Sequence, residues 1–93
     1  MRHYEMLVML EASIESHSDE VAKIEEVIKN LGGTLTKTDE KGKKALAYPI
    51  RKKTEGYYVL FNFDLEPAQT FELKRILGLR ANIYRFLLLV VDE

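Results

Sequence analysis

The residues best suited to chemistry in this sequence are cationic side chains gathered in one short stretch. Between Lys41 and Lys53 lie six of the chain's fourteen Lys and Arg residues, and no acidic residue interrupts them. The stretch falls on two strand-like runs, 43–50 and 56–61, which are joined by a basic, glycine-containing turn. A positive field on a strand pair suits an anionic partner such as a nucleic acid. A solvated hairpin end, whose lysines protect an edge strand from aggregation, explains the same pattern equally well.

Catalytic and metal-binding chemistry has little support in the sequence. There is no cysteine, which excludes disulfides, thiolate zinc sites and thiol nucleophiles. His3 and His17 stand far apart, and neither has the adjacent cluster of acids that a metal site or a catalytic base requires. We expect His3 to be a strand-surface residue and His17 a loop residue. Asp64 and Glu66 would act in acid–base catalysis only inside a pocket that raises a pKa, and nothing in the sequence indicates one. We therefore expect no enzyme, no metal and no cofactor.

Length and composition are those of one soluble globular domain spanning residues 1–93. The chain is 46% hydrophobic and 31% charged, which is ordinary for a globular protein. The apolar run at 6–10 is too short for a secretory signal and alternates instead, and the uncharged run at 86–91 is too short to span a membrane. These features predict a cytoplasmic protein with no membrane partner and no small-molecule substrate.

The formal net charge is −1, so the chain is not a globally basic nucleic-acid binder. Its charges are nevertheless unevenly distributed, because residues 11–26 contain six acidic residues and Lys23 as the one Lys or Arg. We expect the acidic segment to form the solvated face of a helix. A domain with one acidic and one basic region can bind RNA through the second while the first repels it.

The order of hydrophobic periodicities predicts six elements. Residues 3–10 and 57–65 alternate as strands do, and Val21, Ile24, Ile28 and Leu31 recur as on one face of a helix. That helix has Ser16 or Ser18 as its N-cap and ends at Gly32-Gly33. The remaining predicted elements are a strand over 34–38 that is interrupted near 39–42 and resumes over 43–50, a short helix between Pro67 and Gly78, and a closing strand over 83–91.

This β-α-β-β-α-β order predicts an α+β, ferredoxin-like domain. Short connections and right-handed crossovers give a four-stranded antiparallel sheet with both helices on one face and the first and third strands in the centre. Pro49 lacks a backbone donor, which favours an edge position for the second strand. The residues expected to meet the helices are Tyr4, Met6, Val8, Val59, Phe61, Phe63, Phe86 and Leu88.

The opposite face of this sheet is unusually apolar. When one face of a sheet is uncovered, the side chains that point to that face are normally polar. A contiguous apolar patch there usually marks an interaction surface. Self-association, or cover by the short termini, remains an alternative. The residues expected at a partner-protein interface on this face are Leu7, Met9, Tyr58, Leu60, Leu87 and Leu89.

Along nearly its whole length the chain resembles the family of bacterial small-ribosomal-subunit protein six. The resemblance rests on Arg2-His3-Tyr4-Glu5, on the block from Gly42 to Lys52 with its Leu46-Ala47-Tyr48-Pro49-Ile50 centre, on Gly56-Tyr57-Tyr58 and on Asn82-Ile83-Tyr84-Arg85. It implies a structural protein of the small subunit. Such a protein would bind the central domain of the small-subunit RNA together with small-subunit protein eighteen during assembly of the platform.

The resemblance also implies which basic residues contact RNA. Each would touch phosphate or sugar and so position the protein without reading base sequence, while a solvated charge is the alternative for any one of them. The chain lacks the charged tail that is frequent in the family, Tyr84 stands where a second basic residue is common, and Val90 stands where a lysine can occur. The residues implied to bind RNA are Arg2, Lys44, Arg51, Lys52, Arg80 and Arg85.

A second hypothesis keeps the fold and changes the function. A homodimeric small-molecule sensor of the ACT type would use the open sheet face for self-pairing and a helix–strand junction for its ligand. It requires a concentration-dependent dimer and a ligand-dependent melting shift.

Overall fold

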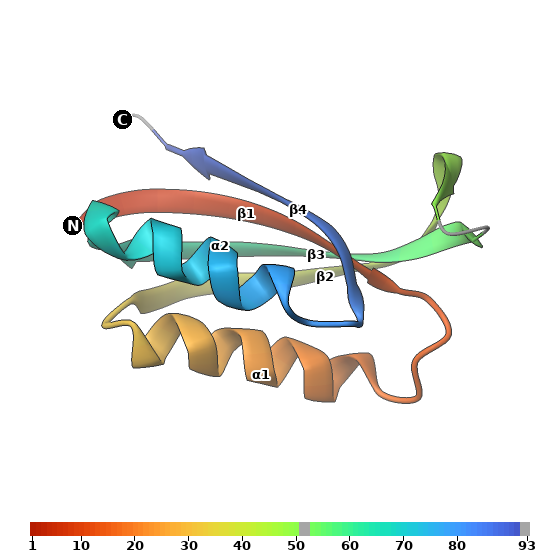
Figure 1. Cartoon of the computed structure of the whole chain (residues 1–93), viewed down its shortest axis with the longest axis horizontal. Coiled ribbons are helices and arrows are strands. Elements are labelled where there is room, and N and C mark those ends of the chain that lie inside the picture. The colour runs from red at the N-terminus through yellow and green to blue at the C-terminus, as the bar shows by residue number, and fades with distance from the viewer. Residues whose placement is uncertain (51–52, 92–93) are drawn as a thin grey trace.

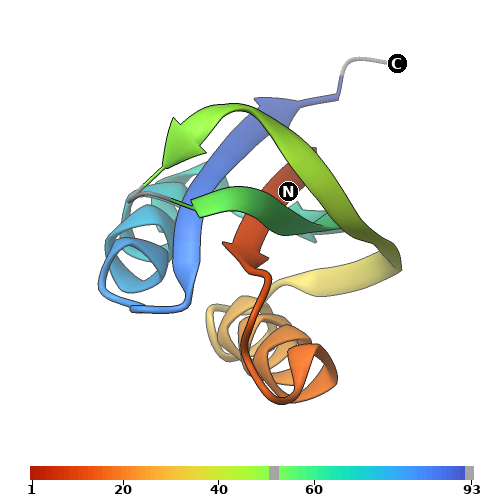
Figure 2. The same ribbon diagram turned by 90° about the vertical axis from the view of Figure 1, so that its right-hand side faces the viewer.

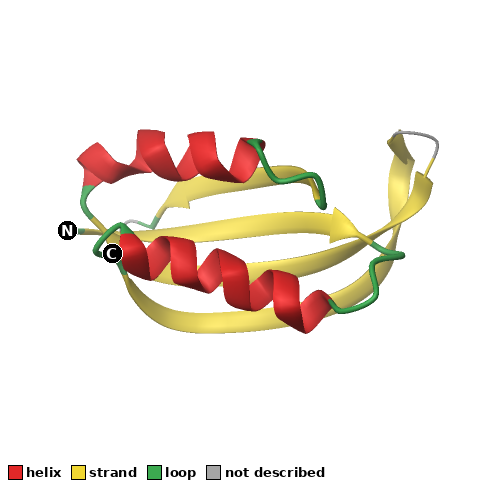
Figure 3. Cartoon of the chain, turned by 60° about the horizontal axis from the view of Figure 1, so that its bottom comes forward, coloured by secondary structure: helices red, strands yellow, loops and turns green. Residues whose placement is uncertain are grey.

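The computed structural model describes residues 1–50 and 53–91, apart from the side chains of 46–50 and 53. The sheet is antiparallel with the order β2-β3-β1-β4, so the predicted central placement of the first and third strands is confirmed. Both helices lie on one face of this sheet, and the other face is uncovered (Figures 1 and 3). The elements are β1 (Arg2–Glu11), α1 (His17–Asn30), β2 (Thr34–Ile50), β3 (Lys53–Leu65), the single turn η1 (Pro67–Gln69), α2 (Thr70–Gly78) and β4 (Ile83–Val90).

Helix α1 begins and ends at the predicted signals. The side chain of Ser16 accepts a hydrogen bond of 3.3 Å from the backbone N–H of Asp19, as an N-cap does. At the other end Gly32 has φ +85°, a conformation that glycine adopts without strain. Gly33 is required for space, because a Cβ there would lie 2.8 Å from the side chain of Ile28. Its N–H also donates to the Ile28 carbonyl at 2.9 Å.

Strand β2 is one continuous element where the sequence predicted an interruption. Its register against β3 shifts at three places, one of them between Glu40 and Gly42, and Gly42 has φ +86°. A bulge accommodates the extra residue and bends the strand without ending it. β2 lies at the edge of the sheet, as predicted from Pro49. The β2–β3 hairpin extends past the helices and turns away from them (Figures 1 and 2).

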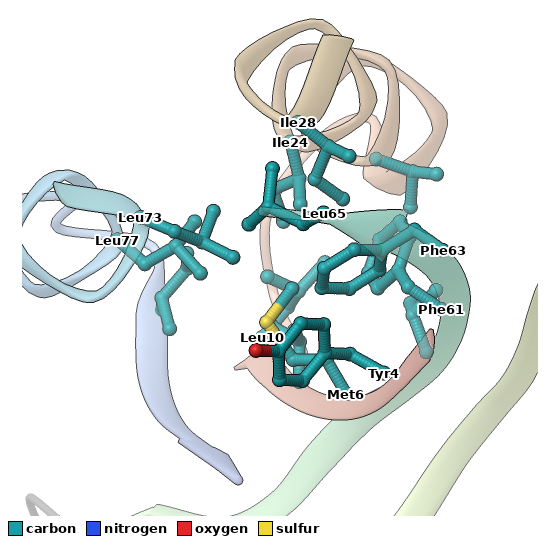
Figure 4. Packing of buried hydrophobic residues seen from close by; sticks show 14 residues of the cluster. Tyr4, Met6, Leu10, Ile24, Ile28, Phe61, Phe63, Leu65, Leu73 and Leu77 are labelled. Carbon is teal, nitrogen blue, oxygen red and sulfur yellow. The ribbon is translucent and has the colours of Figure 1, made fainter. Parts of the chain in front are cut away.

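The core lies between the sheet and the two helices (Figure 4). Alternate residues of β1 and β3 meet one stripe of α1 and two leucines of α2, as the periodicities predicted, while Phe86 and Leu88 are partly buried against this cluster. Phe71 differs from the other apolar residues of its segment, because it is 78% exposed on the outer side of α2. The buried hydrophobic residues are Tyr4, Met6, Val8, Leu10, Val21, Ile24, Ile28, Val59, Phe61, Phe63, Leu65, Leu73, Leu77 and Ile83.

Candidate interaction surface

The six predicted interface residues lie together on the uncovered face of the sheet. Leu7 on β1 stands opposite Leu60 on β3 and opposite Leu87 on β4, so these three leucines form one row across the sheet. Met9 and Tyr58 form the next row, and Leu89 lies beside Glu5 in the row on the other side. Directly opposed residues of an antiparallel pair project to the same face. The apolar residues therefore form one continuous strip, which we call the open-face strip.

Much of this strip is accessible in the free chain. Leu7, Leu87 and Leu89 are 36%, 55% and 49% exposed, and Met9, Tyr58 and Leu60 are half-buried. A hollow of about 310 Å³ opens on the same face, and Leu7, Met9, Tyr58, Arg85, Phe86 and Leu87 line it. A shallow apolar depression with one guanidinium and one phenol at its edge is suited to receiving an apolar side chain of another protein.

Arg85 lies on the open face because it alternates with Phe86 and Leu88, which pack against the core. Leu10 stands opposite Ile83, whereas the next residue of β1, Met9, stands opposite Arg85, so the register passes over Tyr84. Strict alternation would place residue 85 on the same side as the buried Ile83. The bulge at Tyr84 therefore allows Ile83 to face the core although Arg85 and Leu87 face the exposed side.

Further cations border the strip on its β2 side. Lys44 stands opposite Gly56 and Lys37 opposite Asn62, in line with the open-face residues of β3. Lys41 forms an ion pair of 2.7 Å with Asp39, and the Lys41 ammonium lowers the pKa of that carboxyl. One row of opposed residues crosses the whole sheet, from Gly42 on β2 through Tyr58 and Met9 to Arg85 on β4. Three strand spacings separate its two ends, a distance of about 15 Å. The open face thus has an apolar centre with a basic residue at each margin.

Arg80 has a different environment from Lys44 and Arg85. Its Nη2 donates to Glu20 Oε1 at 3.0 Å, and its Nε donates to Oε2 of the same carboxylate. Glu20 is 3% exposed, which corrects for this residue the prediction that the acidic residues of α1 form a solvated face; Asp19 and Glu26 are exposed, as predicted. The hydrogen bonds from Arg80 lower the pKa of the Glu20 carboxyl, whereas burial opposes this. The sequence could not show this pair, because sixty residues separate its members.

Arg2 lies at the other end of the sheet from Lys44. It stands opposite Leu65, whereas Lys44 is in line with Gly56 and Glu11, nine residues further along β1. At about 3.3 Å per residue this separates the two cations by about 30 Å. Arg51 and Lys52 lie outside the described residues. Of the six cations that the resemblance implied for RNA binding, the structure brings Lys44 and Arg85 to the margins of one surface.

Both histidines make local contacts. His3 Nδ1 lies 2.7 Å from Asp64 Oδ1, in a pair that sits at the end of the open face next to the N-terminus. His17 is the first residue of α1, which corrects its prediction as a loop residue. Its ring stacks on Tyr57 with centroids 3.8 Å apart, and its Nε2 lies 3.0 Å from the Glu11 carbonyl oxygen. These contacts join α1 to the sheet.

The profile of the ribosomal protein S6 family matches residues 3–89. The chain belongs to this family. It is 38% identical to the small ribosomal subunit protein bS6 of Caldanaerobacter subterraneus over 95 aligned positions that cover both chains completely. It is 39% identical to the bS6 protein of Micrococcus luteus, covering all of this chain and 94% of the relative. The resemblance found in the sequence is thereby confirmed.

Solved structures agree with this assignment at the level of the fold. The crystal structure of 30S ribosomal protein S6 from Thermotoga maritima superposes with a TM-score of 0.91 at 22% identity, over 97% of this chain and 87% of that one. The P2 domain of the chemotaxis kinase CheA, also from Thermotoga maritima, reaches a TM-score of 0.68 at 16% identity over 97% of this chain and 98% of that one. The second likeness shows only that the ferredoxin-like fold serves other functions as well.

Membership in the S6 family makes the chain a structural protein of the small subunit of the cytoplasmic ribosome. Of the two functions considered for this fold, family membership favours the ribosomal one over the small-molecule sensor. Among the described residues no helix combines the length and the apolar character that a membrane crossing demands.

Proposed function

We propose that this S6 family member binds small-subunit ribosomal RNA jointly with a second protein, small-subunit protein eighteen, as an assembly component of the platform. The observation that carries the proposal is the open face, where a continuous apolar strip lies between Arg85 on one margin and Lys44 on the other. A patch of this kind is expected to be covered in the assembled state. RNA bound at either margin would then form a complex with this chain and protein eighteen.

The two parts of this surface have different physical tasks. Apolar side chains gain free energy by leaving water, so the centre of the strip suits a protein partner with apolar anchors. Lysine and arginine at the margins attract phosphate groups and release counterions when they bind them. A few neutralised phosphates give weak binding that falls steeply with salt. The partner protein would therefore add both contact area and further cations.

RNA binding with and without the partner tests the proposal. A central-domain fragment of the small-subunit RNA is titrated with this chain, with protein eighteen and with both together, at several salt concentrations. We expect weak, salt-sensitive binding by this chain alone and cooperative binding by the pair. Absence of binding by the folded chain in every mixture at low salt would overturn the proposal. Concentration-dependent dimerisation through the strip would then favour self-pairing.

Substitution of the marginal cations tests the assignment of RNA contacts. The double variant Lys44→Ala, Arg85→Ala should reduce the slope of log affinity against log salt by about 0.7 to 0.9 per lost phosphate contact. Lys23→Ala together with Lys29→Ala removes the same formal charge from exposed positions on α1, and we expect it to leave the slope nearly unchanged. Equal slopes for the two double variants would remove Lys44 and Arg85 from the RNA interface.

A further inference from the structure

We propose that β4 pairs with the β4 strand of a second copy of this chain, antiparallel and centred on Leu88, so that the free chain forms a two-fold symmetric dimer. The inference concerns the chain before it meets RNA or another protein, and it does not depend on the proposed RNA binding. It rests on a difference between the two edges of the sheet, which are formed by β2 and β4 (Figure 1).

The β2 edge has the features that keep a sheet edge from pairing. Its register against β3 shifts at three places, and Gly42 has φ +86° at one of them. Lysines at positions 37, 41, 43 and 44, and Pro49, lie along the same strand. Natural sheets protect exposed edges with lysines, prolines and bulges of this kind. We therefore expect no further strand on this side.

The β4 edge lacks these features. From Phe86 to Val90 the strand has no charged residue and no proline, and its register against β1 is regular from Arg85 onward. In the part of the chain that the structure describes, β4 pairs with β1 alone. Leu87, Leu89 and Val90 are exposed on it. A regular, apolar edge strand without protection is expected to accept another strand.

One hydrogen bond shows which backbone groups of β4 point outward. The N–H of Val91 donates to the carbonyl of His3 at 2.9 Å, so residue 91 directs its N–H toward β1. In a regular antiparallel ladder, hydrogen-bonded pairs alternate with pairs that are not hydrogen-bonded, and the next pair is Val90 with Tyr4. Every second residue of β4 therefore directs both its N–H and its C=O away from β1. These residues are Phe86, Leu88 and Val90.

A second copy of β4 satisfies these groups in one symmetric register. With a two-fold axis at Leu88, this residue pairs with its own counterpart, and Phe86 pairs with Val90 of the second copy. Each of the three resulting pairs exchanges two backbone hydrogen bonds. The outward groups are evenly spaced about Leu88, so the symmetric register leaves none of them without a partner.

The side chains are compatible with the same register. On the open face Leu87 would lie opposite Leu89 of the second copy, in a pair whose side chains approach closely because it is not hydrogen-bonded. Arg85 would lie opposite Val91 of the second copy, so no like charges meet. Because Leu7 and Leu60 lie on β1 and β3, away from the joint, a second protein can still bind the open-face strip. One strand from each chain makes a small contact, so we expect a weak, concentration-dependent dimer.

Amide hydrogen exchange of the free chain at different concentrations tests the inference. The amides of residues 86, 88 and 90 should exchange about tenfold slower at about 1 mM protein than at about 10 μM, whereas those of 85, 87 and 89, which face β1, should change little. In sedimentation the average mass should rise from 10.8 kDa toward twice that value. A chain that stays monomeric at about 1 mM would overturn the proposal. Protection of the three edge amides only after protein eighteen is added would also overturn it, in favour of a strand from that protein.

Two charge variants test the register. Leu87→Lys with Leu89→Lys sets like charges opposite each other across the joint and should abolish the dimer, whereas Leu87→Glu with Leu89→Lys sets opposite charges there and should restore it. Both positions are exposed, so both variants should fold, which thermal unfolding checks. A dimer that persists in the first variant, or is absent from both, would overturn this register.

Leu7→Gln is the matched control, because it changes the strip on β1, one strand away from the joint. It should leave the dimer intact. Loss of the dimer in this variant would show that two strips pack face to face, and edge pairing would be wrong. None of these measurements contains RNA, so a failure of the proposed RNA binding would leave their outcome unchanged.

Discussion

Substitution Leu87→Gln would test directly whether the open-face strip is a protein interface. Leu87 is 55% exposed in the middle of the strip, and its row partners are Leu7 and, beyond it, Leu60. Glutamine has nearly the same size and tolerates solvent, so the free chain should lose less than about 1 kcal/mol of its free energy of unfolding. The effect should appear only when a partner covers the residue.

The expected loss of affinity has two parts. Covering the exposed half of a leucine side chain contributes about 1 to 1.5 kcal/mol, since full burial contributes about 1.5 to 3 kcal/mol. Burying an amide without hydrogen-bond partners costs about 1 to 3 kcal/mol more. Together these predict a loss of about 2 to 4 kcal/mol, or an affinity lower by about 30- to 1000-fold.

The measurement is calorimetric titration of the partner protein into each variant, with thermal unfolding as the check on folding. Leu79→Gln is the matched control, because Leu79 is 74% exposed at the end of α2 on the helix layer. It undergoes the same chemical change outside the strip and should bind as the wild type does. Equal affinities of both variants, with both folded, would refute the assignment of Leu87 to the interface.

Two further predictions concern stability. Gly33→Ala should lower the free energy of unfolding by about 1 to 3 kcal/mol, because the added Cβ would meet the side chain of Ile28 at 2.8 Å; urea unfolding that shows no loss would contradict this. Arg80 first, then the Asn82 side chain and lastly Lys23 lower the pKa of Glu20 below its ordinary value of 4.5, whereas burial opposes them. The contribution of the Glu20 carboxylate is therefore complete above about pH 4.5 and is lost as the pH falls through the folded-state pKa. The difference in unfolding free energy between wild type and Glu20→Gln should shrink between pH 7 and pH 3, and a constant difference would show that Glu20 is not ionised in the fold.

Periodicity and end signals were sufficient to predict most of the fold. Alternation in β1 and β3 separates the buried from the exposed residues, because every second side chain of a strand projects to the same face. The Ser16 cap and Gly33 mark the ends of α1 through local backbone requirements that act within a few residues. Because each of these signals depends on residues that are close together in the chain, it can be recognised without the tertiary structure.

Predictions failed where the structure departs from a regular period. The bulge near Gly42 continues a strand that the sequence suggested was interrupted, and a bulge and a turn share the same glycine signal. His17 was assigned to a loop because nothing in its type distinguishes the first residue of a helix from the residues before it.

Periodicity and local signals were enough to give the element order, the core, the apolar residues of the open face and the family. Arg85 also follows from them, because it alternates with Phe86 and Leu88, which pack on the core. The folded structure was needed to show that Lys44 reaches the open face through a shifted β2 register and that Arg80 is paired with a buried carboxylate sixty residues away. The reason is physical: the side-chain direction after a bulge and the partner of a buried charge depend on contacts between distant segments, and composition and spacing do not encode those contacts.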